Sequence, residues 1–438
     1  MVKVEKDGKV SQLLSSVLIP RMFHATQVFP NEKIKCEDIP AYVDALLNDS
    51  CYKSLVRPAM NIAITAGSRG IRNIDIITKA IVDWVKRQHA VPFIVPAMGS
   101  HGGATAQGQR EILTHYGISE RTMGCPVVSS MEVIKLGVSK SGKTVFFDKH
   151  AYEADGIIVS CRIKPHNAFR GPIESGICKM LTVGLGKQIG ASVVHGDGMA
   201  HIAQNIPEMA KVVLEKAPVL FAVATIENAY DQTYMIDSIL AKDVLDREPE
   251  LLKIAFRQMP SLLVGKTDVL IVDEIGKNFS GTGVDPNITG TFSTPYASGG
   301  IKVQRTCMLD LTEESDGNAL GIGLADVITN KIFSKMDISK MYPNCITSTV
   351  LASAKIPCIV YSDKEAIQLC IRTCTGLSGK QPYVVRIPNS LNIGQVMLSE
   401  RYYNDVIGGK YPNVHAVDQP KALEFDQAGM LQTTCLID

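Results

Sequence analysis

No stretch of the 438-residue chain stays apolar over the ~18 residues that a membrane-spanning helix needs. The first residues also lack the basic flank and apolar core of a secretion signal. Lys+Arg (45) balance Asp+Glu (44), so no excess of one charge attracts the chain to nucleic acid or to an anionic membrane surface. We therefore expect a soluble, cytoplasmic protein that binds neither nucleic acid nor membranes.

Closely spaced cysteine pairs, which mark zinc sites and redox motifs, are missing as well. The 11 cysteines are scattered, and no two of them are separated by two residues. We expect reduced thiols in the core rather than a disulfide framework. Hydrophobic residues at 45% and charged residues at 20% exclude a disordered chain. The length suffices for two or three domains with large cores.

Two nucleotide-binding signatures are also missing. No Gly-x-Gly-x-x-Gly, with an acidic residue about 20 positions later, follows any predicted strand, which counts against a nicotinamide-dependent dehydrogenase. The stretch 184–187, Gly-Leu-Gly-Lys, lacks the glycine spacing and the hydroxyl residue of a phosphate loop. It therefore excludes a nucleoside triphosphatase of that class.

Short apolar runs alternate with amphipathic segments of helical length. The pattern predicts strands at 61–65, 91–96, 156–160, 219–226 and 269–272, and helices at 74–84, 107–116, 173–185 and 318–336. This order is typical of βαβ units and parallel sheets.

We therefore predict two α/β domains with mainly parallel sheets and an active-site cleft between them. Residues 1–262 are expected to form the cofactor-binding and catalytic domain, and residues 263–438 a second domain that closes over the site. The boundary is placed where two helix-like stretches end and a new strand begins.

Three side chains suited to chemistry follow predicted strands, where open α/β sheets bind ligands. They are Arg69, His101 and His166. Glycines on both sides of His101 leave its imidazole free of core packing, as a base near neutral pH requires, although it could merely cap the next helix. His166 lies in the basic loop 162–170, which predicts an anion site, with a structural histidine as the alternative.

The apolar segment 174–188 contains two lysines, Lys179 and Lys187. A lysine that its neighbours desolvate loses its charge and becomes a nucleophile able to bond covalently to a cofactor. The alternative for either lysine is a packed stem whose ammonium reaches water.

Metal-ligand spacing is absent around the later histidines. His195 and His201 are too far apart to bind one metal from a single helical face, and no Cys/His cluster accompanies them. Structural histidines are the default interpretation. A metal at this position would take few ligands from the protein and the others from a cofactor.

In order and spacing, five of these residues resemble the nickel-pincer-dependent lactate racemase family of 2-hydroxy-acid racemases and epimerases. The resemblance implies that Arg69 holds the substrate carboxylate, and that His101 and His166 act as paired acid/bases. It further implies that Lys179 bonds covalently to the cofactor and that His195 ligates nickel.

The cofactor implied by this resemblance is the nickel-pincer nucleotide, pyridinium-3-thioamide-5-thiocarboxylic acid mononucleotide nickel, attached covalently to lysine. We further predict that the cofactor is contacted by Lys187, Gly184 and Gly186. The substrate is predicted to be contacted by Ser68 and Lys277. The partners expected are a small 2-hydroxy acid and the enzymes that make the cofactor.

The reaction implied is the racemisation or epimerisation of a 2-hydroxy acid. It proceeds by reversible hydride transfer to the bound cofactor, through a planar 2-keto acid. Residues 66–68 lack the Asp that often precedes the arginine in this family, and the second domain has no tryptophan, so we expect a branch distinct from the lactate enzymes. Two alternatives stay open: a non-catalytic protein of the same fold that binds small anions, and a nicotinamide-dependent 2-hydroxy-acid dehydrogenase.

Overall fold

The computed structural model describes residues 4–68 and 70–437, which form two compact α/β units. Pro30–Met259 forms the first, called here the central unit. The described residues of Met1–Phe29 and Pro260–Asp438 form the second, the terminal unit. The predicted α/β class with mainly parallel sheets is confirmed.

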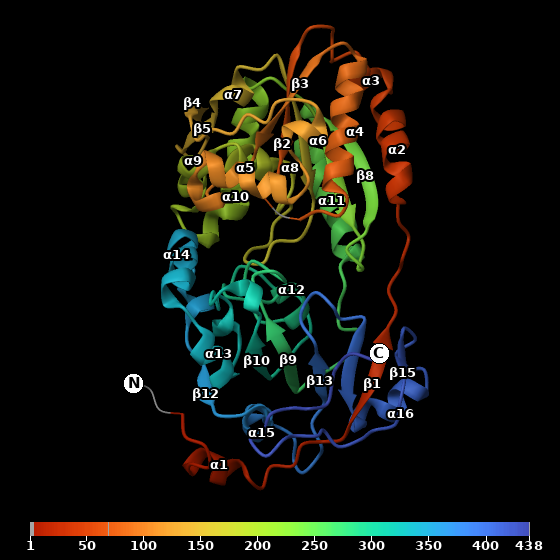
Figure 1. The fold of residues 1–438 in the computed structure, drawn as a ribbon, viewed down its shortest axis with the longest axis vertical. Helices are drawn as coiled ribbons and strands as arrows, with labels where there is room; N and C mark the ends of the chain where they lie inside the picture. The colour runs from red at the N-terminus through yellow and green to blue at the C-terminus, as the bar shows by residue number, and fades with distance from the viewer. Residues whose placement is uncertain (1–3, 69, 438) are drawn as a thin grey trace. The chain divides into compact units, whose positions relative to one another are not determined.

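A five-stranded sheet of order β3-β2-β6-β7-β8 organises the central unit (Figure 1). The strands are β2 (Asn61–Ala66), β3 (Val91–Pro96), β6 (Gly156–Arg162), β7 (Val219–Glu227) and β8 (Thr233–Leu240). All neighbours pair in parallel except β7 with β8. A separate hairpin pairs β4 (Val133–Val138) with β5 (Thr144–Asp148).

Helices surround this sheet. They are α2 (Ile39–Leu47), α3 (Ser50–Lys53), α4 (Ile74–Arg87), α5 (Ala106–His115), α6 (Glu120–Met123), α7 (Lys149–Tyr152), α8 (Ile177–Lys179), α9 (Lys187–His195), α10 (Met199–Lys216) and α11 (Val244–Gln258). A π-helical turn, Met180–Gly184, lies between α8 and α9. Among the described residues, every helix is too short or too polar to cross a bilayer.

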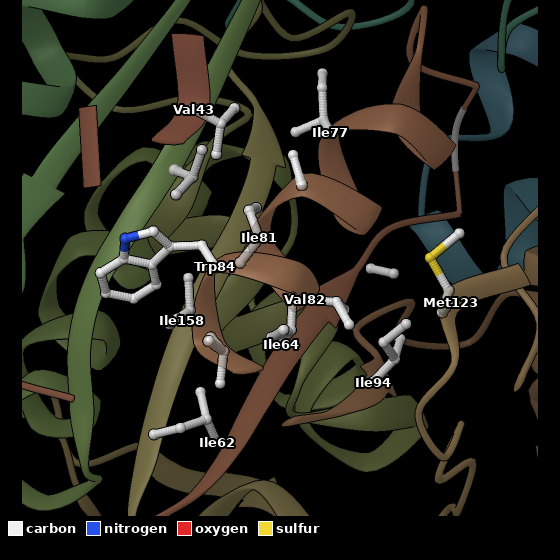
Figure 2. Close-up of a cluster of buried hydrophobic side chains, with 14 of the residues drawn as sticks. Val43, Ile62, Ile64, Ile77, Ile81, Val82, Trp84, Ile94, Met123 and Ile158 are labelled. Atoms are coloured by element: carbon white, nitrogen blue, oxygen red, sulfur yellow. The ribbon is translucent and has the colours of Figure 1, made fainter. Parts of the chain in front are cut away.

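A hydrophobic core of the central unit lies between α4 and the sheet, as Figure 2 shows. Apolar residues recur along α4 at helical spacing, so one face of the helix is buried. Trp84 from this face meets Phe221 of β7 edge to face, with ring centroids 6.1 Å apart. Ile64 of β2 lies beneath it, fully buried and paired with Ile94 and Ile158 on the neighbouring strands.

The terminal unit contains an eight-stranded mixed sheet of order β12-β11-β10-β9-β13-β14-β1-β15. Its strands are β1 (Met22–Gln27), β9 (Val269–Ile275), β10 (Arg305–Leu311), β11 (Val327–Thr329), β12 (Cys358–Val360), β13 (Val384–Ile387), β14 (Gln395–Ser399) and β15 (Val414–Ala416). Its helices are α1 (Lys9–Leu14), α12 (Pro286–Thr289), α13 (Asn330–Lys335), α14 (Ile338–Ser348), α15 (Asp363–Thr373) and α16 (Tyr403–Ile407).

The division of the chain differs from the predicted domains 1–262 and 263–438. Strand β1 pairs antiparallel with β14 on one side and β15 on the other, so the first 29 residues belong with the C-terminal ones. The residues of β1 that face the core are fully buried there, among them Phe23 and Ala25. A pairing partner almost 400 residues away leaves no local signal in the sequence.

The helix predicted at 318–336 is wrong. The structure has strand β11 there, followed by α13. Val327 and Ile328 pair in parallel with β10 and β12, and both are buried. A short apolar run inside a sheet has no alternation with polar residues, so its spacing alone does not separate it from a buried helix.

The strands predicted in the central unit are confirmed. The strand at 91–96 has its predicted ends, and those at 61–65, 156–160 and 219–226 extend by one or two residues. The helix predicted at 173–185 begins later, at Ile177, because residues before it bond back to the loop that follows β6.

Substituting Ile64→Ala should lower the free energy of unfolding by about 2–5 kcal/mol, because the cavity would lie between three packed strands. Urea denaturation followed by fluorescence of the single tryptophan, Trp84, would measure this. Val91→Ala provides the control on the same sheet, since Val91 is 52% exposed. Equal losses in the two variants would contradict the placement of the core.

Candidate active site

The site residues predicted in the central unit converge on one edge of its sheet. Strands β3, β2 and β6 are parallel neighbours, so their carboxyl ends meet there. Ser68 follows β2, His101 follows β3 and His166 follows β6. This is the position at which open α/β sheets bind ligands. The predicted carboxylate-binding residue, Arg69, lies outside the described residues.

The His101 side chain stands on a short glycine-rich turn. Its Nδ1 makes a short hydrogen bond with the Ser68 hydroxyl, which links the loops after β2 and β3. Gly102 has a φ of +66°, and a Cβ there would lie 2.6 Å from the backbone nitrogen of Gln109. Gln109, fully buried, donates from its side chain to the carbonyl of Gly99 (3.0 Å). The contacts with Gln109 therefore fix the turn, while the His101 imidazole is exposed.

A buried carboxylate organises the loop that carries His166. Glu174 is 1% exposed and accepts hydrogen bonds from the backbone nitrogens of His166 (2.6 Å) and Gly171 (3.2 Å). Arg170 pairs with the same carboxylate at 3.3 Å. Burial raises the pKa of Glu174, while the hydrogen bonds and Arg170 oppose that shift. Charge-assisted bonds of this kind hold a loop without secondary structure.

The His166 ring has a defined tautomer. The backbone nitrogen of Ala168 donates to its Nδ1 (3.1 Å), so a neutral ring carries its proton on Nε2. The ring lies against Phe169, with centroids 4.4 Å apart. Burial, then the charges of Lys179 and His195, hold the pKa of His166 well below its usual value of 6.5. His166 is therefore neutral at physiological pH.

Lys179 lies near two histidines. It ends α8 and is half-buried, and its ammonium lowers the pKa of both His166 and His195. Because Coulomb effects weaken with distance and screening, the three side chains must lie near one another. The structure thus brings together two residues that follow β6 and one from the end of α9.

His195 has the geometry of a single metal ligand. Its Nδ1 is 2.7 Å from the carbonyl of Ala191, which accepts only, so Nδ1 carries the proton and Nε2 keeps its lone pair. Burial lowers the pKa of His195, so the ring is neutral as metal binding requires. Nowhere in residues 4–68 and 70–437 do three His, Cys, Asp or Glu side chains gather as metal ligands would.

Residues 11–176 match the family model of the lactate racemase N-terminal domain. Over this stretch, which is less than half of its length, the chain is similar to that domain. The match supports a racemase-type function. No curated protein shows significant sequence similarity to the chain.

Two solved structures resemble the chain at low sequence identity. The lactate racemase apoprotein from Thermoanaerobacterium thermosaccharolyticum is 14% identical, with a TM-score of 0.48, over 83% of this chain and 93% of that one. A structural-genomics target from Thermotoga maritima is 10% identical, with a TM-score of 0.48, over 64% of this chain and 72% of that one. The similarity to lactate racemases in sequence lies in residues 11–176.

The structure places Lys187, a predicted cofactor contact, in the interior of the central unit. Its side chain is fully buried, with Nζ 2.6 Å from the Pro96 carbonyl and 2.9 Å from Asp148 Oδ2. Burial lowers the pKa of this ammonium, while Asp148 opposes the shift. Neither reaction with a cofactor nor contact with water is open to it. The ammonium instead joins α9 to the ends of β3 and β5.

Gly184 and Gly186 also have a packing role in place of the predicted cofactor contacts. Both are buried. A Cβ on Gly184 would lie 2.8 Å from the carbonyl oxygen of Ala97, and one on Gly186 would lie 2.2 Å from that of Thr182. The Gly184 carbonyl also accepts from the backbone nitrogen of Gly99 (3.1 Å). The His101 loop therefore packs backbone to backbone on the turn that follows Lys179.

The basic loop 162–170 is not an open anion site. Arg162 forms a short ion pair with Glu227 at the end of β7. Arg170 pairs with Glu174 and lies over the ring of Phe256, 5.4 Å from its centroid. These two guanidinium groups are committed to the protein itself.

Lys277 lies in the terminal unit, in the loop after β9. Its Nζ donates to the carbonyl of Gly281 (2.6 Å), and its backbone nitrogen donates to the Ser315 hydroxyl (2.9 Å). A substrate contact by Lys277 stays a prediction.

Two buried glutamates near the site escaped the sequence analysis. Glu174 stands in the stretch 174–180, in which only Lys179 was predicted to be a site residue. Glu248 stands in a charged stretch of α11. An acidic residue that is buried by tertiary packing has the same local pattern as a solvated one.

The depressed pKa of His166 predicts a pH dependence of stability. The unfolded chain takes up this proton near pH 6.5 and the folded chain resists it, so acidification below that pH favours unfolding. Relative to a His166→Asn variant, the wild type should lose about 1 kcal/mol of unfolding free energy between pH 6.5 and 5.5. Asparagine can still accept from the Ala168 nitrogen without titrating.

Urea denaturation at each pH would measure the difference. His89→Asn is the matched control, because His89 is exposed and has a φ of +58°, which asparagine tolerates. A constant difference between wild type and His166→Asn across this range would show that His166 is not held neutral.

Proposed function

We propose that the protein is a racemase or epimerase of a 2-hydroxy acid that works with a covalently bound nickel-pincer nucleotide. Lys179 would carry the cofactor, His195 would ligate its nickel, and His101 and His166 would exchange protons with the substrate. The partners proposed are the 2-hydroxy acid and the enzymes that make the cofactor. The observation that carries the proposal is the cluster of Lys179 with two neutral histidines beside the His101 loop.

The chain's own residues suit this group in two ways. The half-buried Lys179 stands at the start of a helical segment, where its amine can reach a ligand at the sheet edge. His195 presents the lone pair of Nε2, since Nδ1 is bonded to Ala191. When bound, the nucleotide would supply an acceptor for the C2 hydrogen as hydride, which avoids a carbanion next to a carboxylate.

The histidines would handle the hydroxyl proton. Loss of the C2 hydrogen leaves a planar 2-keto acid only if the hydroxyl proton leaves too, and a neutral imidazole can take it. His101 is held by Ser68 at Nδ1, so its Nε2 is the atom that points outward. His166 rests with its proton on Nε2, and to act as a base there it must first move that proton to Nδ1.

Covalent attachment would also tune the second histidine. An amide-like bond at Lys179 removes the ammonium, which is one cause of the low pKa of His166. The pKa of His166 would then rise towards neutrality, where a general acid/base is most effective. Attachment would in this way prepare the histidine as well as fix the cofactor.

An anion-binding protein without catalysis fits these residues less well. Two of the arginines that would bind an anion, Arg162 and Arg170, are paired with Glu227 and Glu174. A binding site for a small anion also gains nothing from imidazoles that are held neutral.

Co-expression with the cofactor-making enzymes should yield a covalent adduct on Lys179. Intact-mass measurement followed by peptide mapping would locate it. Lys187 is the internal comparison, because its ammonium is buried and ion-paired. An adduct on Lys187, or none on either lysine, would contradict the assignment. The His195→Ala variant should keep the adduct but retain less nickel by elemental analysis.

Each histidine should serve as base for one stereoisomer. His101→Ala should slow the formation of keto acid from one enantiomer by roughly 10²–10⁴-fold and spare the other, and His166→Ala should do the reverse. The reason is geometric, since a base fixed on one side of a planar product reaches only one of the two hydroxyl positions.

Single-turnover oxidation, measured from each enantiomer of a panel of 2-hydroxy acids, would separate these half-reactions. Dicarboxylates and aldonic acids belong in the panel. His115→Ala, an exposed histidine of the same unit, is the control and should leave both enantiomers unaffected. Wild-type rates in both site variants would remove the histidines from the mechanism.

A further inference from the structure

Beneath the turn that carries Lys179 lies a carboxylate that the proposed reaction does not use. Glu248 projects from α11 and is fully buried. Its Oε2 accepts from the backbone nitrogen of Cys178 at 2.9 Å. The Ile177 nitrogen and the Cys178 thiol also face this carboxylate and lower its pKa.

The Glu248 carboxylate caps the N-terminus of α8, where the residue before the helix has no side chain that could do so. The first turn of a helix has backbone N–H groups without partners, which a nearby side chain normally satisfies. The residue before α8 is Gly176, which has no side chain to cap it. A Cβ at Gly176 would lie 2.2 Å from Glu248 Oε1, so the glycine makes room for a cap from another helix.

The surroundings of Glu248 are otherwise apolar or weakly polar. Among the described residues, its Oε1 has no hydrogen-bond partner. Cys161 of β6 and Cys178 are the titratable groups near it, and burial holds the pKa of both thiols well above 9.0. Burial also raises the pKa of Glu248 to about 7. Burying this carboxylate costs desolvation free energy. The hydrogen bond that it accepts from the turn before Lys179 offsets part of that cost.

We propose that Glu248 is a positioning residue for Lys179: by capping the Ile177–Cys178 turn, it fixes the lysine in its half-buried place beside His166 and His195. The idea builds on the proposed function, in which Lys179 is the attachment point. The proposed fixing of Lys179 by Glu248 does not require a bound cofactor. It can therefore be tested on the protein without one.

The test is trace acetylation of the full-length protein with acetic anhydride, with the rate at each lysine read by peptide mass spectrometry. Three lysines form an internal scale: Lys187 is buried, Lys179 is half-buried, and Lys253 on the same helix as Glu248 is exposed. Glu248→Gln and Glu248→Ala are compared with wild type. The matched control is Glu250→Gln, an exposed glutamate two residues further along α11.

If Glu248 fixes the turn, Glu248→Ala should acetylate Lys179 at least about threefold faster, because the released lysine spends more time in water. Glu248→Gln should show a smaller rise, because its amide oxygen can still accept from the Cys178 nitrogen. Lys187 and Lys253 should keep their wild-type rates, and Glu250→Gln should change none of the three. Glu248→Asp, which keeps the charge on a shorter stem, should restore part of the protection.

Two results would overturn the proposal. One is an unchanged Lys179 rate in variants that remain folded by circular dichroism. The other is a parallel rise at Lys187, which would show general opening of the unit rather than release of one turn. Neither result depends on the nickel nucleotide, so a failure here differs from a missing adduct on co-expression.

Discussion

A buried ammonium joins the parts of the central unit that carry the site. Lys187 reaches from the start of α9 to the Pro96 carbonyl at the end of β3 and to Asp148 at the end of β5. Removing one partner of such a pair leaves an uncompensated charge and costs about 3–5 kcal/mol, so the pair strongly resists separation. The loop of His101 follows β3 and His195 ends α9. This contact, together with the hydrogen bond from the Gly99 nitrogen to the Gly184 carbonyl, fixes their relative placement.

Buried carboxylates act on the other side chains of the site in a similar way. Glu174 collects backbone N–H groups of the His166 loop, and Glu248 caps the turn before Lys179. Each of these segments lacks regular secondary structure or a local cap, so its backbone needs a partner from elsewhere. A carboxylate accepts several N–H groups at once and can hold an irregular backbone.

The same burial sets the charge state of the site. Both His166 and His195 are held neutral by desolvation and by the Lys179 ammonium. The positive charges of the neighbouring loop are neutralised by ion pairs, as in the pair of Arg162 with Glu227. The result is a pair of uncharged imidazoles with opposite tautomers, one with its proton on Nδ1 and the other on Nε2. In the proposed function, that difference would leave Nε2 of His195 for a metal and would give His166 a proton to donate to a substrate oxygen.

The sequence by itself determined the α/β class, the strands β2, β3, β6 and β7 of the central sheet and the loops that follow them, because hydrophobic period and glycine position are local properties. It did not predict β8, the antiparallel edge strand. It also determined the order and spacing of the family residues. Only the tertiary structure separated Lys179 from Lys187: both lie in one apolar segment, yet one meets two histidines and the other a buried aspartate. It alone placed β1 in the distant sheet and Glu248 under α8. The reason is physical, since desolvation and ion pairing depend on neighbours that the chain supplies from far along its length.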